Sequence, residues 1–359
     1  MQNGISIYPG LDNSLEENLT LIETAASLGI QRIFTSLHIP ESDTSVFKQE
    51  LGEILRFARH HHMEIISDIS PVTLDLLNLD HFSLSAFQFL GIRTLRLDYG
   101  YGTDEIAELS RNAQGMRIQL NASTITGQIL TELLHKKANF SNIDALHNFY
   151  PREGTGISEE TLVRKTAMLH KAGIAGAAFV PSQHRRRSPL RRGLPTLEMH
   201  RDVSLSLAAR HLAAVGIDSV FISDSLPSND ELKELSQLKN AQVALKARLF
   251  SNDPVQTELL KHTFTSRIDE ARDAIRAQES RPLLKKSGHT ISPENTKVRP
   301  YGAITLDNKD YQRYMGELQI IKRPQPADPR TNVAAQLLEE ECFLINYIIP
   351  GKKFSFRFT

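Results

Sequence analysis

Two aspartates and an arginine have the types and spacing that acid–base chemistry requires. Arg96 and Asp98 lie two residues apart in the apolar run TLRLDYGYG (94–102), and Asp68 lies between isoleucines in IISDIS (65–70). Two carboxyl groups about 5–5.5 Å apart can cleave a glycosidic bond with retention of configuration, and a wider pair can do so with inversion. Adjacent β-strands are about 4.8 Å apart, so Asp68 and Asp98 meet the shorter distance if their strands are neighbours.

The residues around the two aspartates suggest different roles for them. Arg96 beside Asp98 would keep that carboxylate ionised, as a nucleophile or base requires, whereas the apolar neighbours of Asp68 would favour its protonated form. Glu153, in the loop NFYPREGTG, and Asp224 are alternative acids. The structural interpretations are a solvated loop residue for Glu153, a helix N-cap for Asp224 and a buried ion pair for Arg96 with Asp98.

These residues need a scaffold in which several strands end on one face. From residue 4 to about 235, eight β-type runs alternate with amphipathic helical segments. The segment 14–29, for example, opens with Ser14 and Glu17 at capping-box spacing and ends at Gly29. The alternation favours a (β/α)8 TIM barrel over an open doubly wound sheet, and no Gly-x-Gly-x-x-Gly motif follows the first run. The β-type runs cover residues 5–10, 32–40, 63–70, 93–100, 116–123, 142–151, 173–181 and 216–225.

Residues two apart on a barrel strand point to the same side. Four consecutive strands then end with polar side chains that face the barrel interior, at the end where TIM barrels build their active sites. His147 or Asn148 of the sixth strand would join them, depending on its register. The polar pairs are Ser36 with His38, Asp68 with Ser70, Arg96 with Asp98, and Gln119 with Asn121.

The loop after the seventh strand, residues 181–201, is strongly basic. Barrels often bind phosphate in the loops after strands seven and eight, and arginine can hold phosphate with two N–H groups. We therefore expect a phosphate or another anionic group to bind here, with an ordinary solvated loop as the alternative. The basic residues are His184, Arg185, Arg186, Arg187, Arg191 and Arg192.

The overall composition restricts the partners. Lys plus Arg and Asp plus Glu each total 42 among 359 residues, so no net field favours nucleic acid or a membrane surface. The single cysteine, Cys342, excludes an internal disulfide, no apolar run reaches the ~20 residues of a membrane span, and the N-terminus lacks a signal peptide. We expect a cytoplasmic protein, and the sequence leaves open whether it forms a homo-oligomer.

Several other chemistries lose support. No lysine ends a strand where a Schiff base would need it, and the histidines at 60–62 lie at a helix end, where we expect them on the surface. His38, His147 and Asp68 match no metal-binding spacing. We therefore expect neither a metal nor a cofactor.

The sequence changes in character after about residue 240. Residues 281–302 are rich in Pro, Lys and Ser, and the following segments have the pattern of short strands joined by turns at Asp307-Asn308 and Pro350-Gly351. We predict a catalytic barrel domain at 1–238 and a small antiparallel β-rich domain at 239–359.

Segments along nearly the whole chain resemble the MupG-type 6-phospho-N-acetylmuramidases of bacteria, and they occur in the order expected for that family. The segments are GISIYPG (4–10), RIFTSLHIPE (32–41), DISP (68–71), LRLDYG (95–100), LNAST (120–124), HNFYPREGTGIS (147–158), GLPTLEMHR (193–201) and RPYGAITLDNKDYQRYMGELQI (299–320).

The resemblance implies a TIM barrel followed by a cyclophilin-like β-barrel domain. It also implies hydrolysis of the β-1,4 bond between N-acetylmuramic acid 6-phosphate and N-acetylglucosamine, during cytoplasmic recycling of cell-wall peptidoglycan. A non-catalytic phosphosugar-binding or sensing protein and a phosphosugar isomerase are the alternatives. The expected catalytic residues are Asp68, Asp98 and Glu153, and the expected substrate-binding residues are Ser36, His38, Arg96, Asn121, His147, Asn148, Arg186, Arg187 and Arg191.

Overall fold

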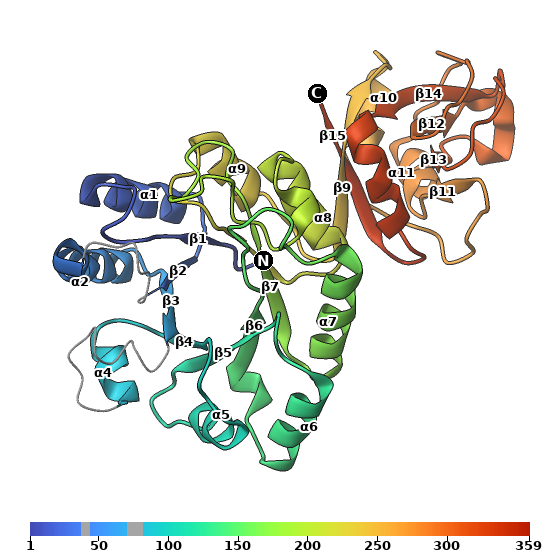
Figure 1. The fold of residues 1–359 in the computed structure, drawn as a ribbon. Coiled ribbons are helices and arrows are strands. Elements are labelled where there is room, and N and C mark those ends of the chain that lie inside the picture. Colours follow the sequence, from blue (N-terminus) through green and yellow to red (C-terminus); the bar gives the residue numbers. More distant parts are fainter. Residues whose placement is uncertain (37–43, 70–81) are drawn as a thin grey trace. The chain divides into compact units, whose positions relative to one another are not determined.

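The computed structural model describes residues 1–36, 44–69 and 82–359 and divides into two compact units (Figure 1). The first unit consists of Met1–Leu212 and Gly216–Asn240. The second consists of Ala213–Val215 and Ala241–Thr359. In the part of the chain so described, no helix is both long enough and apolar enough to cross a bilayer.

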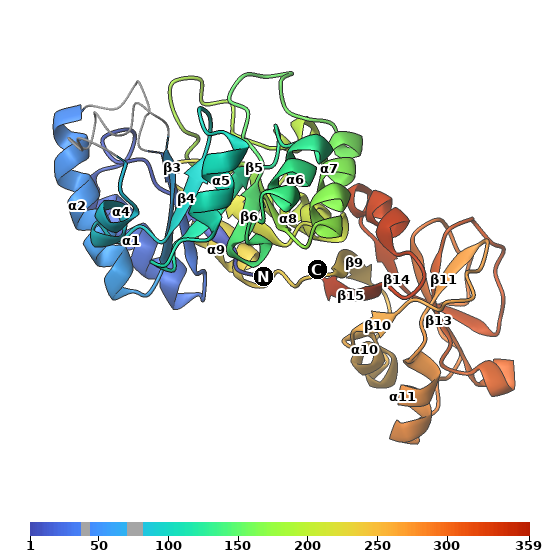
Figure 2. The same ribbon diagram turned by 90° about the horizontal axis from the view of Figure 1, so that it is seen from below.

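The first unit is a closed barrel of eight parallel strands, which confirms the predicted TIM-type architecture (Figures 1 and 2). Each strand pairs with the next along the chain, and β1 pairs with β8 to close the ring. Each predicted β-type run overlaps one strand. The strands are β1 (Gly4–Ser6), β2 (Arg32–Ser36), β3 (Glu64–Ile69), β4 (Thr94–Leu97), β5 (Arg117–Asn121), β6 (Ile143–Leu146), β7 (Ala175–Val180) and β8 (Ser219–Ile222).

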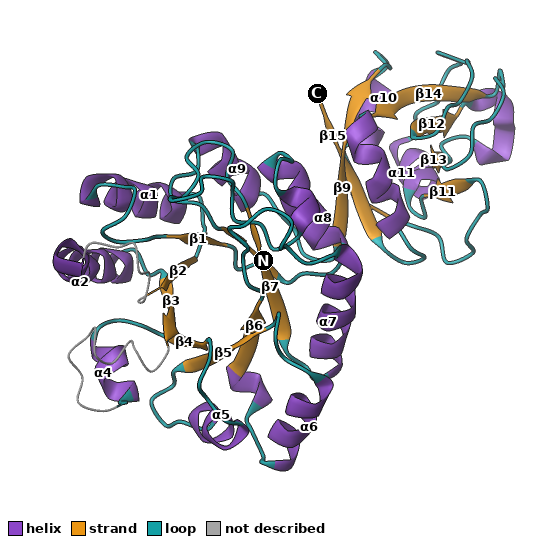
Figure 3. Cartoon of the chain, in the orientation of Figure 1, coloured by secondary structure: helices purple, strands orange, loops and turns teal. Residues whose placement is uncertain are grey.

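Helices lie outside the ring of strands (Figure 3). The predicted capping box of α1 is present: the Glu17 backbone N–H donates to Ser14 Oγ at 3.2 Å, and the Ser14 N–H donates to Glu17 Oε2 at 2.9 Å. The helix ends before Gly29, whose φ of +79° suits glycine. The helices are α1 (Leu15–Ser27), α2 (Thr44–His60), α4 (Leu84–Phe89), α5 (Thr103–Ser110), α6 (Gly127–His135), α7 (Glu159–Lys171), α8 (Leu205–Ala214) and α9 (Asn229–Ser236), with 3-10 turns η1 (Phe140–Asn142) and η2 (Glu198–His200).

The barrel interior has three layers of side chains. At the N-terminal ends of the strands, Arg32 contacts Glu64 at 3.0 Å and Asp144 at 2.8 Å, and we call these three residues the lower ion cluster. Aromatic rings fill the middle, where Phe34 and Phe179 pack with centroids 5.2 Å apart. The polar residues discussed below form the third layer, at the C-terminal ends. The period-two alternation therefore placed the polar side chains inside, as predicted.

The second unit is built on a curled, seven-stranded sheet with the order β10-β15-β9-β14-β12-β13-β11. The predicted β-rich character is confirmed, but the expectation of a purely antiparallel sheet is wrong, because β15 lies parallel beside β9. The strands are β9 (Gln242–Leu249), β10 (Phe264–Thr265), β11 (Ala274–Arg276), β12 (Ala303–Asp307), β13 (Leu318–Ile321), β14 (Thr331–Leu337) and β15 (Lys353–Phe358).

Helical segments also occur in this unit, although the sequence suggested strands joined only by turns. Asn308, expected in a hairpin turn, instead caps the 3-10 segment η3, and its side chain accepts the Asp310 backbone N–H at 3.0 Å. The turn expected at Pro350-Gly351 is present just before β15, with a φ of +80° at Gly351. The helical segments are α10 (Pro254–Leu260), α11 (Ser280–Ser287), η3 (Lys309–Tyr314) and η4 (Glu339–Tyr347).

Candidate active site

Arg96 organises the C-terminal end of the barrel. Its Nη1 lies 2.5 Å from Asp68 Oδ1 and 3.4 Å from Asp98 Oδ1, and its Nη2 lies 2.5 Å from Asn148 Oδ1. Asp98 Oδ1 also accepts Asn121 Nδ2 at 3.2 Å. Strands β3 to β6 thus deliver five polar side chains to one place, and we call these five residues the upper polar cluster.

The closer ion pair is not the one expected from the sequence. Arg96 was expected to pair with Asp98, its neighbour two residues along, but it lies nearer to Asp68, its register partner on β3. Asp68 is also the more buried: its side chain is 10% exposed, against 27% for Asp98. The reasoning that made Asp98 the charged partner of Arg96 and Asp68 the protonated acid is therefore not supported.

The register of β6 separates His147 from Asn148. Asn148 faces Arg96, whereas His147 is fully buried, with Nδ1 3.2 Å from Ser123 Oγ. Burial, together with the positive charges of Lys165 and Arg96, lowers the pKa of His147 to about 3, so its ring is neutral. Ser123 Oγ also accepts the Asn148 backbone N–H at 2.9 Å. This placement favours a supporting role for His147 and reveals Ser123, which the sequence reasoning missed.

Of the two further candidates Ser36 and His38, the structure describes only the first. Ser36 is buried at the end of β2, in register with Asp68 on β3. His38 lies outside the described residues, as does Ser70. The described part of this face therefore contains the predicted Ser36, Asp68, Arg96, Asp98, Asn121 and Asn148.

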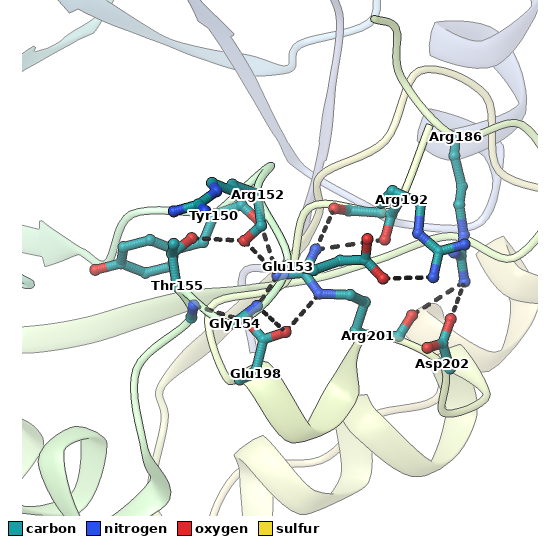
Figure 4. Close-up of polar contacts among 12 residues, drawn as sticks. Tyr150, Arg152, Glu153, Gly154, Thr155, Arg186, Arg192, Glu198, Arg201 and Asp202 are labelled. Atoms are coloured by element: carbon teal, nitrogen blue, oxygen red, sulfur yellow. Dashed lines mark hydrogen bonds and ion pairs between the residues drawn. The ribbon is translucent and has the colours of Figure 1, made fainter. Parts of the chain in front are cut away.

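Carboxylates already neutralise several arginines of the basic loop. Arg185 pairs with Glu17 at 2.9 Å. Arg186 pairs with Asp202 at 3.2 Å, as Figure 4 shows. Arg191 is exposed, and its φ of +52° shows a left-handed backbone. Position on the functional face alone therefore does not identify the arginine that holds an anion.

Arg187 differs from the other arginines of the loop. It is about nine-tenths buried, and its guanidinium carbon lies 4.8 Å from the ring centroid of Tyr8 and 5.0 Å from that of Phe149. Within residues 1–36, 44–69 and 82–359, Arg187 forms no ion pair with a carboxylate, and its Nε has no hydrogen-bond partner. Arg187 thus offers a stacked, rigid cation with N–H groups still to be satisfied.

Asp224 fixes the backbone that carries Arg187. The Arg187 N–H donates to Asp224 Oδ1 at 2.9 Å, and the Ser182 N–H donates to Oδ2 at 3.0 Å. Burial raises the pKa of Asp224 to about 6, against the lowering effect of these amides. Of the two roles considered for Asp224, acid or helix cap, the contacts instead show a residue that organises the loop after β7.

Glu153 lies on the rim formed by the loops after β6 and β7 (Figure 4). Its Oε1 is 2.5 Å from Arg192 Nη2, and its side chain is 54% exposed. The rim is held by Glu198, which accepts the backbone N–H groups of Gly154 at 2.9 Å and Gly156 at 2.7 Å. A bidentate bond from Arg201 lowers the pKa of Glu198 to about 2. Glu153 is therefore a paired rim residue, and neither Glu198 nor Arg201 was predicted as a site residue from the sequence.

Two family models match nearly the whole chain. The family model described as 6-phospho-N-acetylmuramidase, N-terminal, matches residues 3–237. The family model described as 6-phospho-N-acetylmuramidase, C-terminal, matches residues 243–357. No curated protein matches the chain.

Two solved structures are similar over the full length. An uncharacterised Bacillus cereus protein is 31% identical with a TM-score of 0.84, covering 99% of this chain and 98% of its own. A conserved Enterococcus faecalis protein of unknown function is 32% identical with a TM-score of 0.70, covering 99% and 96%. With both halves matched, the chain belongs to the 6-phospho-N-acetylmuramidase family of glycosidases.

Proposed function

We propose that this protein hydrolyses the β-1,4 bond between N-acetylmuramic acid 6-phosphate and N-acetylglucosamine, in cytoplasmic recycling of peptidoglycan. The observation that carries the proposal is the pair Asp68 and Asp98 on one guanidinium, at the barrel end where enzymes of this fold act. The single cysteine is consistent with a reducing compartment.

We further propose retention of configuration, with which the geometry is compatible. Asp68 Oδ1 and Asp98 Oδ1 both contact Arg96 Nη1, at 2.5 and 3.4 Å, so the two oxygens lie no farther apart than the sum of these distances. This limit refers to the two facing oxygens, and it accommodates the about 5–5.5 Å between the carboxyl groups of retaining enzymes.

In the proposed mechanism, Asp68 is the nucleophile, because Arg96 holds it closely and its charge is stabilised by the guanidinium. Its oxygen forms a bond to the anomeric carbon as the glycosidic bond breaks, and Asp98 gives its proton to the departing O4. Asp98 then takes a proton from water, whose oxygen displaces Asp68 and restores the enzyme. The greater exposure of Asp98 suits a group that exchanges protons with water.

We also propose that Arg187 binds the 6-phosphate. It is a buried arginine of the basic loop without a described carboxylate partner, so phosphate oxygens would satisfy its N–H groups. Arg186 and Arg191 remain proposed as additional contacts. Ser36, His38, Asn121 and Asn148 are proposed to bind the sugars, with His147 behind them.

A direct test compares the phosphorylated and unphosphorylated disaccharides. We expect turnover of the phosphorylated one, with proton NMR detecting the β-anomer of the product first. Initial release of the α-anomer would overturn retention, and absence of turnover would overturn the enzymatic proposal. A variant Asp98→Ala that forms a β-glycosyl azide with added azide would identify Asp98 as the acid–base residue, because azide replaces water without needing a base.

The second unit is proposed to be cyclophilin-like, as the resemblance implies. Its curled mixed sheet is compatible with that assignment. The domain boundary near residue 238 and a homo-oligomeric state are likewise proposals.

A further inference from the structure

The second unit contains a cavity of about 510 Å³ whose walls come from α11, η3, the residues just before β13 and the residues after β10 and β11. A volume of this order is typical of small-molecule sites. None of its lining residues belongs to the upper polar cluster or the basic loop. The cavity is therefore built from residues that the proposed hydrolysis does not use.

A buried carboxylate with an unsatisfied oxygen faces this cavity. Glu317 is 2% exposed, and its Oε1 accepts Arg276 Nε at 2.6 Å. In the described parts of the chain, its Oε2 has no hydrogen-bond partner, and Arg281 Nη1 is 3.8 Å away, beyond hydrogen-bond distance. A buried acceptor without a donor is costly, so a ligand N–H or O–H at this position would be stabilising.

Cationic side chains also line this cavity. Arg281 and Arg313 both stack on Tyr314, with their guanidinium carbons 5.3 and 4.9 Å from the ring centroid. Arg267 is neutralised by Asp269 at 2.7 Å. Neither Arg313 nor Lys285 forms an ion pair among the residues the structure describes, so the cavity presents unneutralised positive charge to an anion.

The backbone along the cavity wall is strained. Gln312 has a φ of +53° and a ψ of −114°, which is unfavourable for any residue except glycine. Nearby, Gly316 packs so closely on α11 that a Cβ would lie 2.6 Å from Leu284 Cδ2. Strained backbone of this kind is typical of binding sites.

We propose that this cavity is a second binding site, for a sugar phosphate. Arg313 and Lys285 would hold the phosphate, and a sugar hydroxyl or amide N–H would donate to Glu317 Oε2. The apolar lining of Leu284 and Met315 suits the C–H face of a sugar ring. The guanidinium groups of Arg281 and Arg313 stack on the Tyr314 ring, so this ring is not available to stack on a nucleobase. The inference does not depend on the reaction proposed for the barrel.

Calorimetric titration of the full chain tests the proposal, using N-acetylglucosamine 6-phosphate, N-acetylglucosamine and inorganic phosphate as separate probes. The titrations use the background variant Arg187→Met, which on the proposed phosphate role of Arg187 should suppress binding at the barrel. We expect the sugar phosphate to bind at least ~10-fold more tightly than either other probe, because only it meets both the cations and the carboxylate.

Two neighbouring lysines provide the matched comparison. Both are exposed residues of α11, but Lys285 lines the cavity and Lys286 does not. We expect Lys285→Gln and Arg313→Gln each to weaken binding ~10-fold or more, and Lys286→Gln to change it less than ~2-fold. Equal losses in both lysine variants, equal affinity for inorganic phosphate, or no binding would overturn the proposal. Hydrolysis by the unmodified protein is measured separately, so either proposal can fail alone.

Discussion

The two ends of the barrel each hold an arginine between two carboxylates. In the lower ion cluster, Arg32 lies between Glu64 and Asp144. In the upper polar cluster, Arg96 lies between Asp68 and Asp98. Both arginines are at most 4% exposed. The residue types alone therefore do not distinguish the two clusters.

The difference lies in how completely the carboxylates are occupied. Asp144 is 7% exposed and accepts Arg32 at 2.8 Å and Gln119 at 2.9 Å, one bond on each oxygen. Asp98 is 27% exposed, and its contacts with Arg96 at 3.4 Å and Asn121 at 3.2 Å both use Oδ1. Loss of one member of a fully occupied buried cluster leaves an uncompensated charge, whereas a partly exposed carboxylate is available to a substrate.

The largest effect on activity should come from the upper polar cluster, the open end of the barrel. Asp98→Asn keeps the size of the side chain but removes its proton exchange, so we expect kcat to fall ~10³–10⁴-fold with little change in Tm. Turnover of the phosphorylated disaccharide and thermal unfolding measure the two effects. Asp104→Asn, an 87% exposed surface aspartate, is the control and should leave kcat unchanged. A loss below ~10-fold in Asp98→Asn would contradict the catalytic assignment.

A substitution in the lower ion cluster, the closed end of the barrel, should lower the stability of the fold. Arg32→Met leaves Glu64 and Asp144 without their cation in the interior, so we expect a loss of ~3–5 kcal/mol in the free energy of unfolding. Urea denaturation measures it. Arg117→Met, which removes a 41% exposed arginine 3.8 Å from the same Asp144, should cost less than ~1 kcal/mol. Similar losses in both variants would remove the distinction between closed and open ends.

Arg187→Met tests the phosphate assignment. The methionine retains contact with Tyr8 and Phe149 but has no charge, so kcat/KM for the phosphorylated disaccharide should fall ~100-fold. Arg185→Met makes the same charge change at a residue already paired with Glu17, and its loss should stay below ~5-fold. Comparable losses in both variants would show that loop charge, rather than Arg187, matters.

The pH dependence of stability should distinguish Asp224. Its pKa rises from about 3.8 to about 6 on folding, so the folded state binds more protons between these values. The corresponding stabilisation is complete below about pH 4 and is lost as the pH rises through 6. The free energy of unfolding of Asp224→Asn, measured by urea denaturation relative to that of the unmodified protein, should therefore be ~1–3 kcal/mol higher at pH 7 than at pH 4. Parallel pH profiles would contradict this.

The smallest effect is expected at the rim. Glu153→Gln removes a charge that is exposed and paired with Arg192, so kcat should change less than ~3-fold. The same assay of turnover applies. A loss of ~100-fold or more would transfer the acid role from Asp98 to Glu153.

The strands and their inward faces could be predicted because side chains alternate with a period of two along a strand. The pairing of Arg96 with Asp68 could not be predicted, because it depends on the register between β3 and β4. The sequence of either strand alone does not determine that register. The choice between His147 and Asn148 depends on one residue of register. Contacts of the basic loop, such as Arg192 with Glu153, join segments that only the folded barrel brings together.

The parallel pairing of β15 with β9 has a consequence for how the second unit forms. Lys353 of β15 is paired with Gln242 of β9. Strand β9 is synthesised near the start of this unit, but it can form this pairing only after β15, the last described strand, has been synthesised. Until then β9 lacks that neighbour, and β10, which pairs with β15, has no place in the sheet. On the ribosome, the barrel strands are all available before this sheet can close, so ribosome-bound chains that stop before residue 353 should expose an unprotected strand edge to chaperones and proteases.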